Sequence, residues 1–272
     1  MGVTELLKIP MYQVDAFTAK VFSGNPAAVC LLDAPMDEAV MQAIAAENNL
    51  AETAFVRIDL KPFELRWFTP TTEVALCGHA TLAAAHVLFS EGIAQNDSIA
   101  FQSLQSGILS VSRAESNSYT LDFPADQLEP YALSSHLIEV VGTPVLDGQK
   151  GVSDLILRLD SAESVRLASP DLQRIQTMPF RGVILTAKGE GEIDFVSRFF
   201  GPAVGVDEDP VTGSAHTSLA VYWSKRLGKT KMTAYQASQR GGTLLCELKG
   251  DRVLLSGDAY LYLKGEIYVP HH

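Results

Sequence analysis

Cysteine is scarce in this chain, and the patterns that mark secreted or membrane-spanning proteins are missing. The three cysteines, Cys30, Cys77 and Cys246, are far apart and odd in number, so they indicate neither a disulfide framework nor a zinc site. We therefore expect a reducing, cytoplasmic environment. No apolar run approaches the roughly 20 residues of a membrane-spanning helix, and Met1 to Tyr12 lack the pattern of a secretory signal. We expect no membrane partner.

Motifs that bind nucleotides, metals or nucleic acids are missing as well. The sequence has no P-loop and no Gly-x-Gly-x-x-Gly that opens a helix, so we expect no organic cofactor and no metal. The formal net charge is -11 and no basic run offsets it, which makes nucleic acid an unfavourable partner. Hydrophobic residues make up 47% of the chain, enough for a sizeable core. A small anionic substrate remains compatible with this charge, because a few backbone N–H groups can bind one locally.

The chain does contain one pattern twice. Three groups of residues recur in the same order at offsets of 132 to 135 residues, nearly half of the 272-residue chain. This regularity indicates an internal duplication and predicts two similar lobes that face each other across a cleft. The matched segments are Phe101-Gln102 with Tyr235-Gln236, Gln105-Ser106-Gly107 with Gln239-Arg240-Gly241, Arg66-Trp67-Phe68-Thr69-Pro70 with Arg198-Phe199-Phe200-Gly201-Pro202, and Glu73 and Gly78-His79-Ala80 with Glu208 and Gly213-Ser214-Ala215.

Periodicity predicts strands mixed with one long helix in each half, which is an α+β lobe built twice. The helix after Gly78 has few charged residues, so we expect a sheet to curl around it. We place the first lobe at 1–125 and the second at 126–272, and allow the strand near 262–270 to return to the first. The predicted strands are 11–18, 27–32, 53–58, 63–68, 98–103, 107–112, 118–123, 154–159, 182–187 and 193–200, and the predicted helices are 37–48, 79–91, 170–177 and 214–227.

The starts of the two repeated helices are the first candidate site. Gly78-His79 in one half corresponds to Gly213-Ser214 in the other. Helix N-termini present unpaired backbone donors and partial positive charge, which suits a carboxylate or a phosphate. The alternative is that these residues only cap their helices. Their repetition favours a shared site, where we expect His79 to stay neutral because it lies at a helix N-terminus.

Glu47 and Asp209 are carboxylates that occur in one half only. Glu47 falls in the last turn of a predicted helix and its counterpart is Met178, so we expect a partly buried group suited to general acid–base work. The alternative is a solvated residue that ends a helix. Glu52 is a second candidate, interpreted as surface or structural. Asp209 corresponds to Val74 and lies in a loop three residues longer than its twin; the alternative there is a turn-forming aspartate before proline.

These residues belong to motifs that resemble the PhzF family of phenazine-biosynthesis-like proteins, and the resemblance covers essentially the whole chain. The motifs are Tyr12-Gln13-Val14-Asp15-Ala16-Phe17, Gly24-Asn25-Pro26-Ala27-Ala28-Val29, Ala46-Glu47-Asn48-Asn49-Leu50, Arg66-Trp67-Phe68-Thr69-Pro70, Cys77-Gly78-His79-Ala80-Thr81, Asp209-Pro210-Val211-Thr212-Gly213-Ser214-Ala215-His216 and Gln239-Arg240-Gly241-Gly242.

The resemblance implies the diaminopimelate-epimerase-like fold, with two pseudo-symmetric lobes that each wrap a barrel-like mixed sheet around a central helix, and a homodimer. It implies a cofactor-independent isomerase that moves a proton on a small carboxylate-bearing substrate. The family's acid–base glutamate falls on Glu47. Its supporting residues fall on His79, Asp209 and Ser214. The residues expected to line the substrate site are Gly78, Ser214, Gly213, Thr212 and Cys77.

One position departs from a related mechanism. In the related epimerases a thiol precedes the central helix of each lobe, whereas here Cys77 is matched by Thr212. This difference argues against racemisation by two thiols and favours a proton shift by a single base. Two rival readings stay open: an amino-acid racemase or epimerase on the same fold, and a protein that binds a small molecule without catalysis. The closing His271-His272 is interpreted as a remnant of an expression tag.

Overall fold

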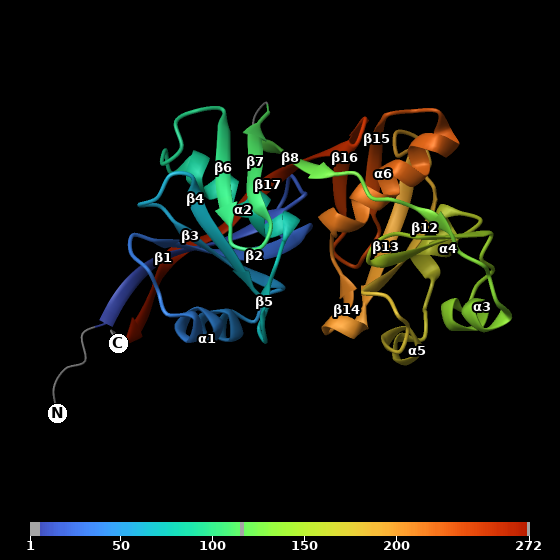
Figure 1. Ribbon diagram of the computed structural model, residues 1–272, viewed down its shortest axis with the longest axis horizontal. Coiled ribbons are helices and arrows are strands. Elements are labelled where there is room, and N and C mark those ends of the chain that lie inside the picture. Colours follow the sequence, from blue (N-terminus) through green and yellow to red (C-terminus); the bar gives the residue numbers. More distant parts are fainter. Residues whose placement is uncertain (1–5, 115–116, 271–272) are drawn as a thin grey trace. The chain divides into compact units, whose positions relative to one another are not determined.

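The computed structural model describes residues 6–114 and 117–270, so His271 and His272 lie outside the described residues (Figure 1). The chain divides into two compact units. The first comprises Met1–Leu121 and Asp258–His272, and the second comprises Asp122–Gly257. The last strand, β17 (Arg252–Pro270), enters the first unit, where its residues 259–270 pair antiparallel with the whole of β1 (Leu6–Ala16). Among the described helices, none is both long and apolar enough to cross a membrane.

The first unit is a mixed sheet with two helices. In chain order its remaining elements are β2 (Asn25–Leu32), α1 (Glu38–Asn48), β3 (Glu52–Arg57), β4 (Phe63–Phe68), β5 (Glu73–Val74), α2 (Gly78–Ser90), β6 (Ser98–Ser103), β7 (Gly107–Arg113) and β8 (Ser118–Pro124). Strand β2 runs parallel to β3 and β4 runs parallel to β6, while β1–β2, β3–β4, β4–β5, β6–β7 and β7–β8 are antiparallel.

The second unit repeats this series of pairings. Its elements are β9 (Glu129–Pro130), α3 (Ser135–Val141), β10 (Asp147–Lys150), β11 (Asp154–Arg158), α4 (Ala162–Leu167), α5 (Leu172–Gln176), β12 (Gly182–Lys188), β13 (Phe195–Gly201), the 3-10 helix η1 (Pro202–Val204), β14 (Val206–Asp209), α6 (Gly213–Leu227), β15 (Lys231–Gln236) and β16 (Gly242–Lys249). Strand β11 is parallel to β12 and β13 to β15, with β10–β11, β12–β13, β13–β14 and β15–β16 antiparallel. The prediction of one α+β lobe built twice is confirmed.

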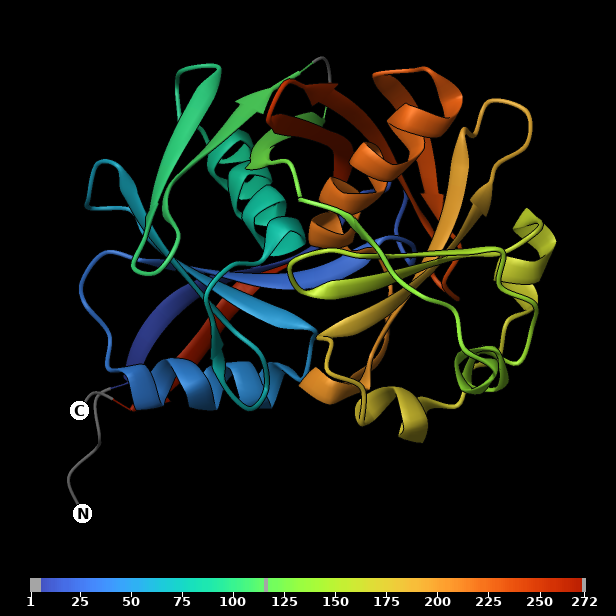
Figure 2. The same ribbon diagram turned by 45° about the vertical axis from the view of Figure 1, so that its right-hand side comes forward.

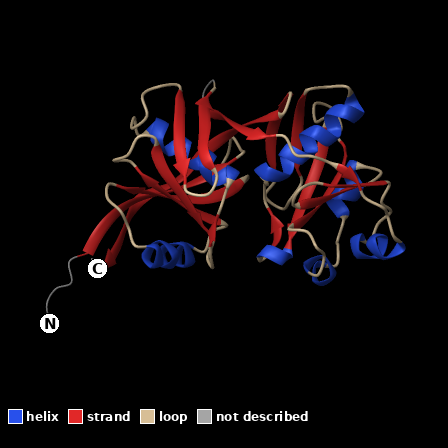
Figure 3. Ribbon diagram, in the orientation of Figure 1, coloured by secondary structure: helices blue, strands red, loops and turns tan. Residues whose placement is uncertain are grey.

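Each unit encloses one apolar helix. Every side chain of α2 from His79 to Phe89 is buried, and the helix packs against β1, β2 and β3. Helix α6 packs against β15 and β16 and exposes only its basic last turn, Lys225 and Arg226. Figure 2 shows each helix among the strands of its own unit, and Figure 3 shows that strands are the commoner regular element in both units. Alanine is the main residue of α2, and its small side chain lets the strands approach the helix closely.

Helix α1 follows from local sequence signals. Asp37 caps it by accepting a hydrogen bond from the Ala39 N–H at 2.8 Å, and Asn49 ends it in the left-handed region at φ 49°. Its inner face contributes Met41, Ile44 and Ala45 to a core cluster of the first unit. The prediction of a helix over 37–48 is therefore accurate to one residue.

Between β11 and β12 the structure departs from the sequence prediction. Two short helices, α4 and α5, replace the single helix expected at 170–177. Pro170 precedes the second of them, where it cannot continue a helix because it lacks a backbone N–H. Asp171 then starts α5 by accepting a hydrogen bond from the Arg174 N–H at 3.1 Å. Helix α3 and the short strands β5, β9, β10 and β14 were not predicted.

The duplication is also visible as a pair of equivalent ion pairs. Arg66 on β4 makes two parallel hydrogen bonds to Glu73, at 2.7 and 2.8 Å. Arg198 on β13 does the same with Glu208, at 2.6 and 2.9 Å. Two-pronged contacts of this kind fix geometry as well as charge. Each one ties a central strand to the segment that leads into the enclosed helix.

Replacing Leu82 of α2 by alanine should destabilise the protein strongly. Leu82 is fully buried, and such a truncation costs about 2–5 kcal/mol because the surroundings close only part of the cavity. Urea unfolding followed by circular dichroism measures the loss. The control is Leu245→Ala on β16, where the side chain is 55% exposed and the expected change is within about 0.5 kcal/mol. Similar losses for both variants would contradict the enclosure of α2.

Candidate functional site

The start of α2 brings Cys77, Gly78 and His79 together in the first unit. Cys77 is the N-cap residue, with an extended backbone and no side-chain hydrogen bond that caps the helix. Thr81 closes the first turn by donating from Oγ1 to the Cys77 carbonyl oxygen at 2.6 Å. The thiol and the imidazole are both buried, with Cys77 7% and His79 4% exposed. A helix that begins in this way keeps backbone donors at its N-terminus.

The His79 ring lies close to three side chains, those of Glu52, Cys77 and Asn25. Its Nε2 is 3.1 Å from Glu52 Oε2, an ion-pair distance without the alignment of a good hydrogen bond. Its Nδ1 is 3.5 Å from Cys77 Sγ and 3.2 Å from the side-chain nitrogen of Asn25. Glu52 begins β3 and its side chain is only 18% exposed, so it is not a surface residue. The three groups Glu52, His79 and Cys77 form a chain of contacts that the sequence prediction did not foresee.

The charges of this chain follow from burial and from the ion pair. Burial alone would lower the pKa of His79, but the neighbouring Cys77 and Glu52 hold it well above its usual value. Burial opposes the charged form of Glu52, yet His79 keeps its pKa below the usual value. Burial raises the pKa of the Cys77 thiol to about 11, so Glu52 is the charged partner at neutral pH. The raised pKa of His79 opposes the expectation that the ring stays neutral. The side-chain nitrogen of Asn25, which faces Nδ1, suits a neutral ring instead.

Glu47 lies apart from this chain, in the last turn of α1 as predicted. It is exposed and makes no side-chain hydrogen bond or ion pair with another described residue, so the expectation of partial burial is wrong. The reason is that Met41, Ile44 and Ala45 occupy the inner face of the helix. Glu47 instead lines the edge of a groove.

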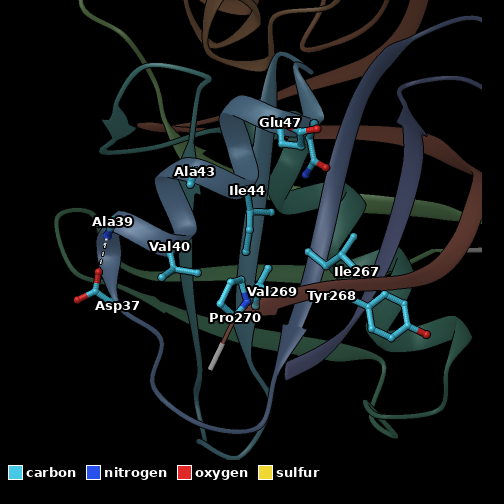
Figure 4. A pocket seen from close by; sticks show the side chains of 11 residues that line it. Asp37, Ala39, Val40, Ala43, Ile44, Glu47, Ile267, Tyr268, Val269 and Pro270 are labelled. Carbon is cyan, nitrogen blue, oxygen red and sulfur yellow. Dashed lines mark hydrogen bonds between the residues drawn. The ribbon is translucent and has the colours of Figure 1, made fainter. Parts of the chain in front are cut away.

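This groove lies between α1 and the end of β17 and has a volume of about 1040 Å³ (Figure 4). Val40 and Ala43 line it from α1, and Ile267 and Val269 line it from β17. Figure 4 shows Glu47 at the C-terminal end of α1, beyond the apolar side chains. The carboxylate thus stands beside an apolar surface while remaining accessible.

In the second unit the loop before α6 holds Asp209 and Thr212 together. Thr212 Oγ1 donates to Asp209 Oδ2 at 2.5 Å. Gln236 of β15 fixes this loop from the other side, because it accepts from the Thr212 N–H at 2.8 Å and donates to the Asp209 carbonyl at 2.7 Å. Gln236 belongs to one of the repeated segments, which is the signal that could have singled it out. Gly213 and Ser214 follow directly as the first residues of α6.

Ser214 is held by a residue that the sequence interpretation missed. Arg181 Nη2 donates to Ser214 Oγ at 2.9 Å, and Arg181 Nε donates to Asp154 Oδ1 at 2.9 Å. Burial alone would lower the pKa of Arg181, but Asp154, Asp209 and Asp126 raise it. Carboxylates therefore outnumber the guanidinium beside Ser214. Arg181 lies outside the repeated segments, so the duplication gave no signal for it.

The strand register agrees with the asymmetry read from the repeat. On β13 and β14, Phe199 lies opposite Asp209; on β4 and β5, Trp67 lies opposite Val74. Phe199 and Trp67 are equivalent in the repeat, so Asp209 and Val74 occupy equivalent positions. The longer loop of the second unit forms η1, next to an irregularity in the β13–β14 register. The carboxylate at this position is therefore a local difference within a repeated framework.

His216, the last residue of the motif that begins at Asp209, is an internal residue. It is fully buried, its Nδ1 lies 2.8 Å from the Thr212 carbonyl oxygen, and its ring stacks near Phe195 at 6.0 Å between centroids. Burial lowers its pKa to about 4, so the ring stays neutral and donates to the carbonyl. It supports the first turn of α6 from inside the unit.

Comparison with known proteins identifies the family. Residues 14–265 match the family model described as phenazine biosynthesis-like protein, and the chain belongs to this PhzC-PhzF family. A protein of Pseudomonas aeruginosa named as an uncharacterized isomerase is 49% identical over 261 residues, which cover 96% of this chain and 99% of the relative. The human phenazine biosynthesis-like domain-containing protein is 42% identical over 289 residues, with coverage of 96% and 99%.

Solved structures agree with this assignment. A PhzF-family phenazine biosynthesis protein from Enterococcus faecalis superposes with a TM-score of 0.93 and 46% identity, covering 97% of this chain and 100% of that chain. A hydroxyproline epimerase from Agrobacterium vitis matches with a TM-score of 0.65 at 10% identity, covering 97% and 93%, which shows a common fold. The fold predicted from the sequence is thus confirmed, and the relatives support an isomerase-type function.

The Glu52–His79 pair should make stability depend on pH. The raised pKa of His79 adds stability that is complete below the unfolded value of 6.5 and is lost as pH rises through the folded value. The lowered pKa of Glu52 adds stability that is complete above 4.5 and is lost as pH falls through the folded value. We expect the Tm difference between wild type and Glu52→Gln to be largest between pH 4.5 and 6.5.

Differential scanning calorimetry across pH measures this difference. The matched control is Glu190→Gln, an exposed carboxylate with no ion pair to another described residue, whose Tm difference should not vary with pH. A Tm difference for Glu52→Gln that is equally flat would show that the two groups do not pair.

Proposed function

We propose that this protein is a cofactor-independent isomerase that moves a proton on a small substrate bearing a carboxylate. The observation that carries the proposal is that a PhzF-family chain has Glu47, His79, Asp209 and Ser214 at the positions where the resemblance expects the site. Cofactor independence rests on the sequence, which contains no motif for a nucleotide cofactor.

Glu47 is the acid–base group of this proposal. It removes a C–H proton from one position of the substrate and returns a proton to another. Its exposed carboxylate has no side-chain partner among the described residues, so it is free to accept a proton. The apolar wall of the groove beside it suits the carbon skeleton of a small substrate. General acid–base catalysis of this kind contributes about 10²–10⁴-fold, so positioning of the substrate supplies much of the remaining acceleration.

The helix starts hold the substrate's polar groups. Gly78 and His79 at α2 offer backbone donors and a ring with a raised pKa, which suits a carboxylate. Ser214 and Gly213 begin α6. Cys77 is the N-cap residue of α2, and Thr212 is the N-cap residue of α6. Asp209 orients a hydrogen-bond donor of the substrate and steadies the shifting charge. Three carboxylates act on Arg181, the residue that donates to Ser214, so we assign the substrate's own carboxylate chiefly to the α2 end.

A single base fits the N-cap residues better than a pair of thiols does. The residue equivalent to Cys77 is Thr212, and its hydroxyl already donates to Asp209 at 2.5 Å. The pKa of an alcohol is far above that of a thiol, so the hydroxyl of Thr212 keeps its proton at neutral pH and does not act as a base. The arrangement therefore supports a proton shift by Glu47 over racemisation between two thiols.

Replacing Glu47 by glutamine should abolish detectable turnover, a loss of at least about 10²-fold, because glutamine cannot accept the proton. The substrate panel consists of cyclic and acyclic amino and hydroxy carboxylic acids, selected by thermal shift. Each hit is incubated in heavy water, and deuterium uptake is followed by NMR. Binding and Tm of the variant should stay near wild type.

The matched control is Glu38→Gln, at the other end of α1, where the exposed carboxylate pairs with Arg66 at 2.6 Å. This variant should keep wild-type exchange. Equal exchange by Glu47→Gln and wild type would remove Glu47 from the mechanism. Hits that bind without exchange in every variant would favour a binding protein without catalysis.

Asp209→Asn should lower turnover by about tenfold or more, because the amide loses the charge that holds the substrate's donor group. The same exchange assay measures this loss, with Tm checked because Asp209 also accepts from Thr212. Asp207→Asn is the control, since Asp207 is exposed on the same strand. If both variants behave alike, the second unit does not contribute this carboxylate to the reaction.

We further propose a homodimer in the cytoplasm. The dimer follows from the family resemblance, and the location is supported by three cysteines that are buried and unpaired. Light scattering at micromolar concentration should give the mass of two chains, and a single chain's mass would contradict the dimer.

A further inference from the structure

We propose that Glu52 is a positioning residue for the proposed isomerase: its carboxylate keeps a proton on Nε2 of His79, so that Nδ1 is the nitrogen that faces the substrate. The inference rests on the proposed function for its consequence, but its structural core is tested without any substrate. It assigns separate tasks to the two nitrogens of one ring.

The contacts of the ring carry the proposal. On one side, Nε2 lies 3.1 Å from the Glu52 carboxylate, an ion-pair distance without the alignment of a good hydrogen bond. On the other side, Nδ1 meets the Cys77 thiol at 3.5 Å and the Asn25 amide at 3.2 Å. A carboxylate only accepts hydrogen bonds and is negatively charged, so it favours a proton on the nitrogen beside it. The side-chain amide of Asn25 serves either state of Nδ1, because its nitrogen donates to a neutral ring and its oxygen accepts from a charged one.

The same three side chains could be taken for a set of metal ligands, since one atom of each lies within 4.8 Å of the others. The ring argues against that reading. Its two nitrogens face different neighbours, Nε2 the Glu52 carboxylate and Nδ1 the Cys77 thiol, so the ring engages the two groups through separate atoms. A carboxylate that fixes one nitrogen of a histidine and leaves the other for chemistry is a common arrangement in enzymes.

The surroundings make Glu52 necessary for this task. His79 is buried at a helix N-terminus, where both desolvation and the helix dipole disfavour a positive charge. Helix α2 packs against β1, β2 and β3. The groups that raise the pKa of His79 are Glu52 of β3 and the neighbouring Cys77. Glu52 is thus the carboxylate that lets the ring hold its proton there.

The consequence is a division of labour within the proposed reaction. With Nε2 engaged, Nδ1–H is the one ring donor left at the start of α2. Sulfur is a weak acceptor, so a substrate carboxylate oxygen can readily replace the Cys77 thiol as the partner of Nδ1. His79 then stabilises negative charge on the substrate, and proton abstraction is left to Glu47.

Two-dimensional ¹H–¹⁵N NMR of the intact protein tests the assignment, with His79→Gln used to identify the ring signals. In wild type Nε2 should keep its proton over the whole titration, and Nδ1 should be the nitrogen that loses its proton at high pH. In Glu52→Gln the proton affinity of His79 should fall by about tenfold or more, as expected on removing an opposite charge at this distance. Glu52→Asp should restore part of it.

A wild-type ring with its neutral-state proton on Nδ1 would overturn the proposal even if Glu52→Gln does not fold. An unchanged proton affinity in Glu52→Gln would overturn it as well. The kinetic arm uses any carboxylic acid that exchanges deuterium: the alkaline limb of kcat/KM should move to lower pH in Glu52→Gln and stay in place in Glu190→Gln. A normal NMR result without turnover on any acid would refute the isomerase and leave the positioning role standing.

Discussion

Enclosing an apolar helix within a curled sheet is the constraint on which each unit depends. The side chains of α2 from His79 to Phe89 are all buried, and the polar residues Cys77, His79 and Thr81 gather where the helix begins. There the first backbone N–H groups have no partner within the helix and can serve a ligand. In the first unit this position holds Cys77, Gly78 and His79. In the second it holds Thr212, Gly213 and Ser214, so one folding requirement creates two comparable sets of donors.

The duplication supplies the framework, and its differences supply the chemistry. Equivalent Arg–Glu pairs, Arg66–Glu73 and Arg198–Glu208, tie the same strands to the same segments in both units. Within that framework the first unit carries a buried ion pair at the helix start, and the second carries Asp209 on a longer loop. The two helix starts therefore differ in charge. The ion pair beside α2 has no net charge, whereas carboxylates outnumber the guanidinium of Arg181 beside α6.

The parts of the fold that the sequence predicted are those with local signals. Helix α1 could be predicted because Asp37 caps it and its apolar residues recur at helical spacing. The enclosed helices could be predicted from their composition, and the equivalence of Asp209 and Val74 from the repeat alone. The short strands and the split between α4 and α5 carried weaker signals, since elements of a few residues show little periodicity.

What the sequence could not predict are the contacts between distant segments. Glu52 pairs with His79 because β3 lies against α2, and nothing within either segment indicates that partner. Arg181 reaches Ser214 across 33 positions of the chain. Glu47 was expected to be partly buried, but Met41, Ile44 and Ala45 occupy the inner face of α1 and leave Glu47 exposed beside the groove.

The position of deuterium in the product tests the central claim most directly. A carboxylic acid that the protein turns over is incubated in heavy water, and the labelled carbon is located by ¹H and ¹³C NMR. A proton shift by one base predicts deuterium on a carbon other than the one that lost its hydrogen, together with a displaced double bond. Deuterium on the original carbon with inverted configuration would contradict the account, because it would identify a racemase.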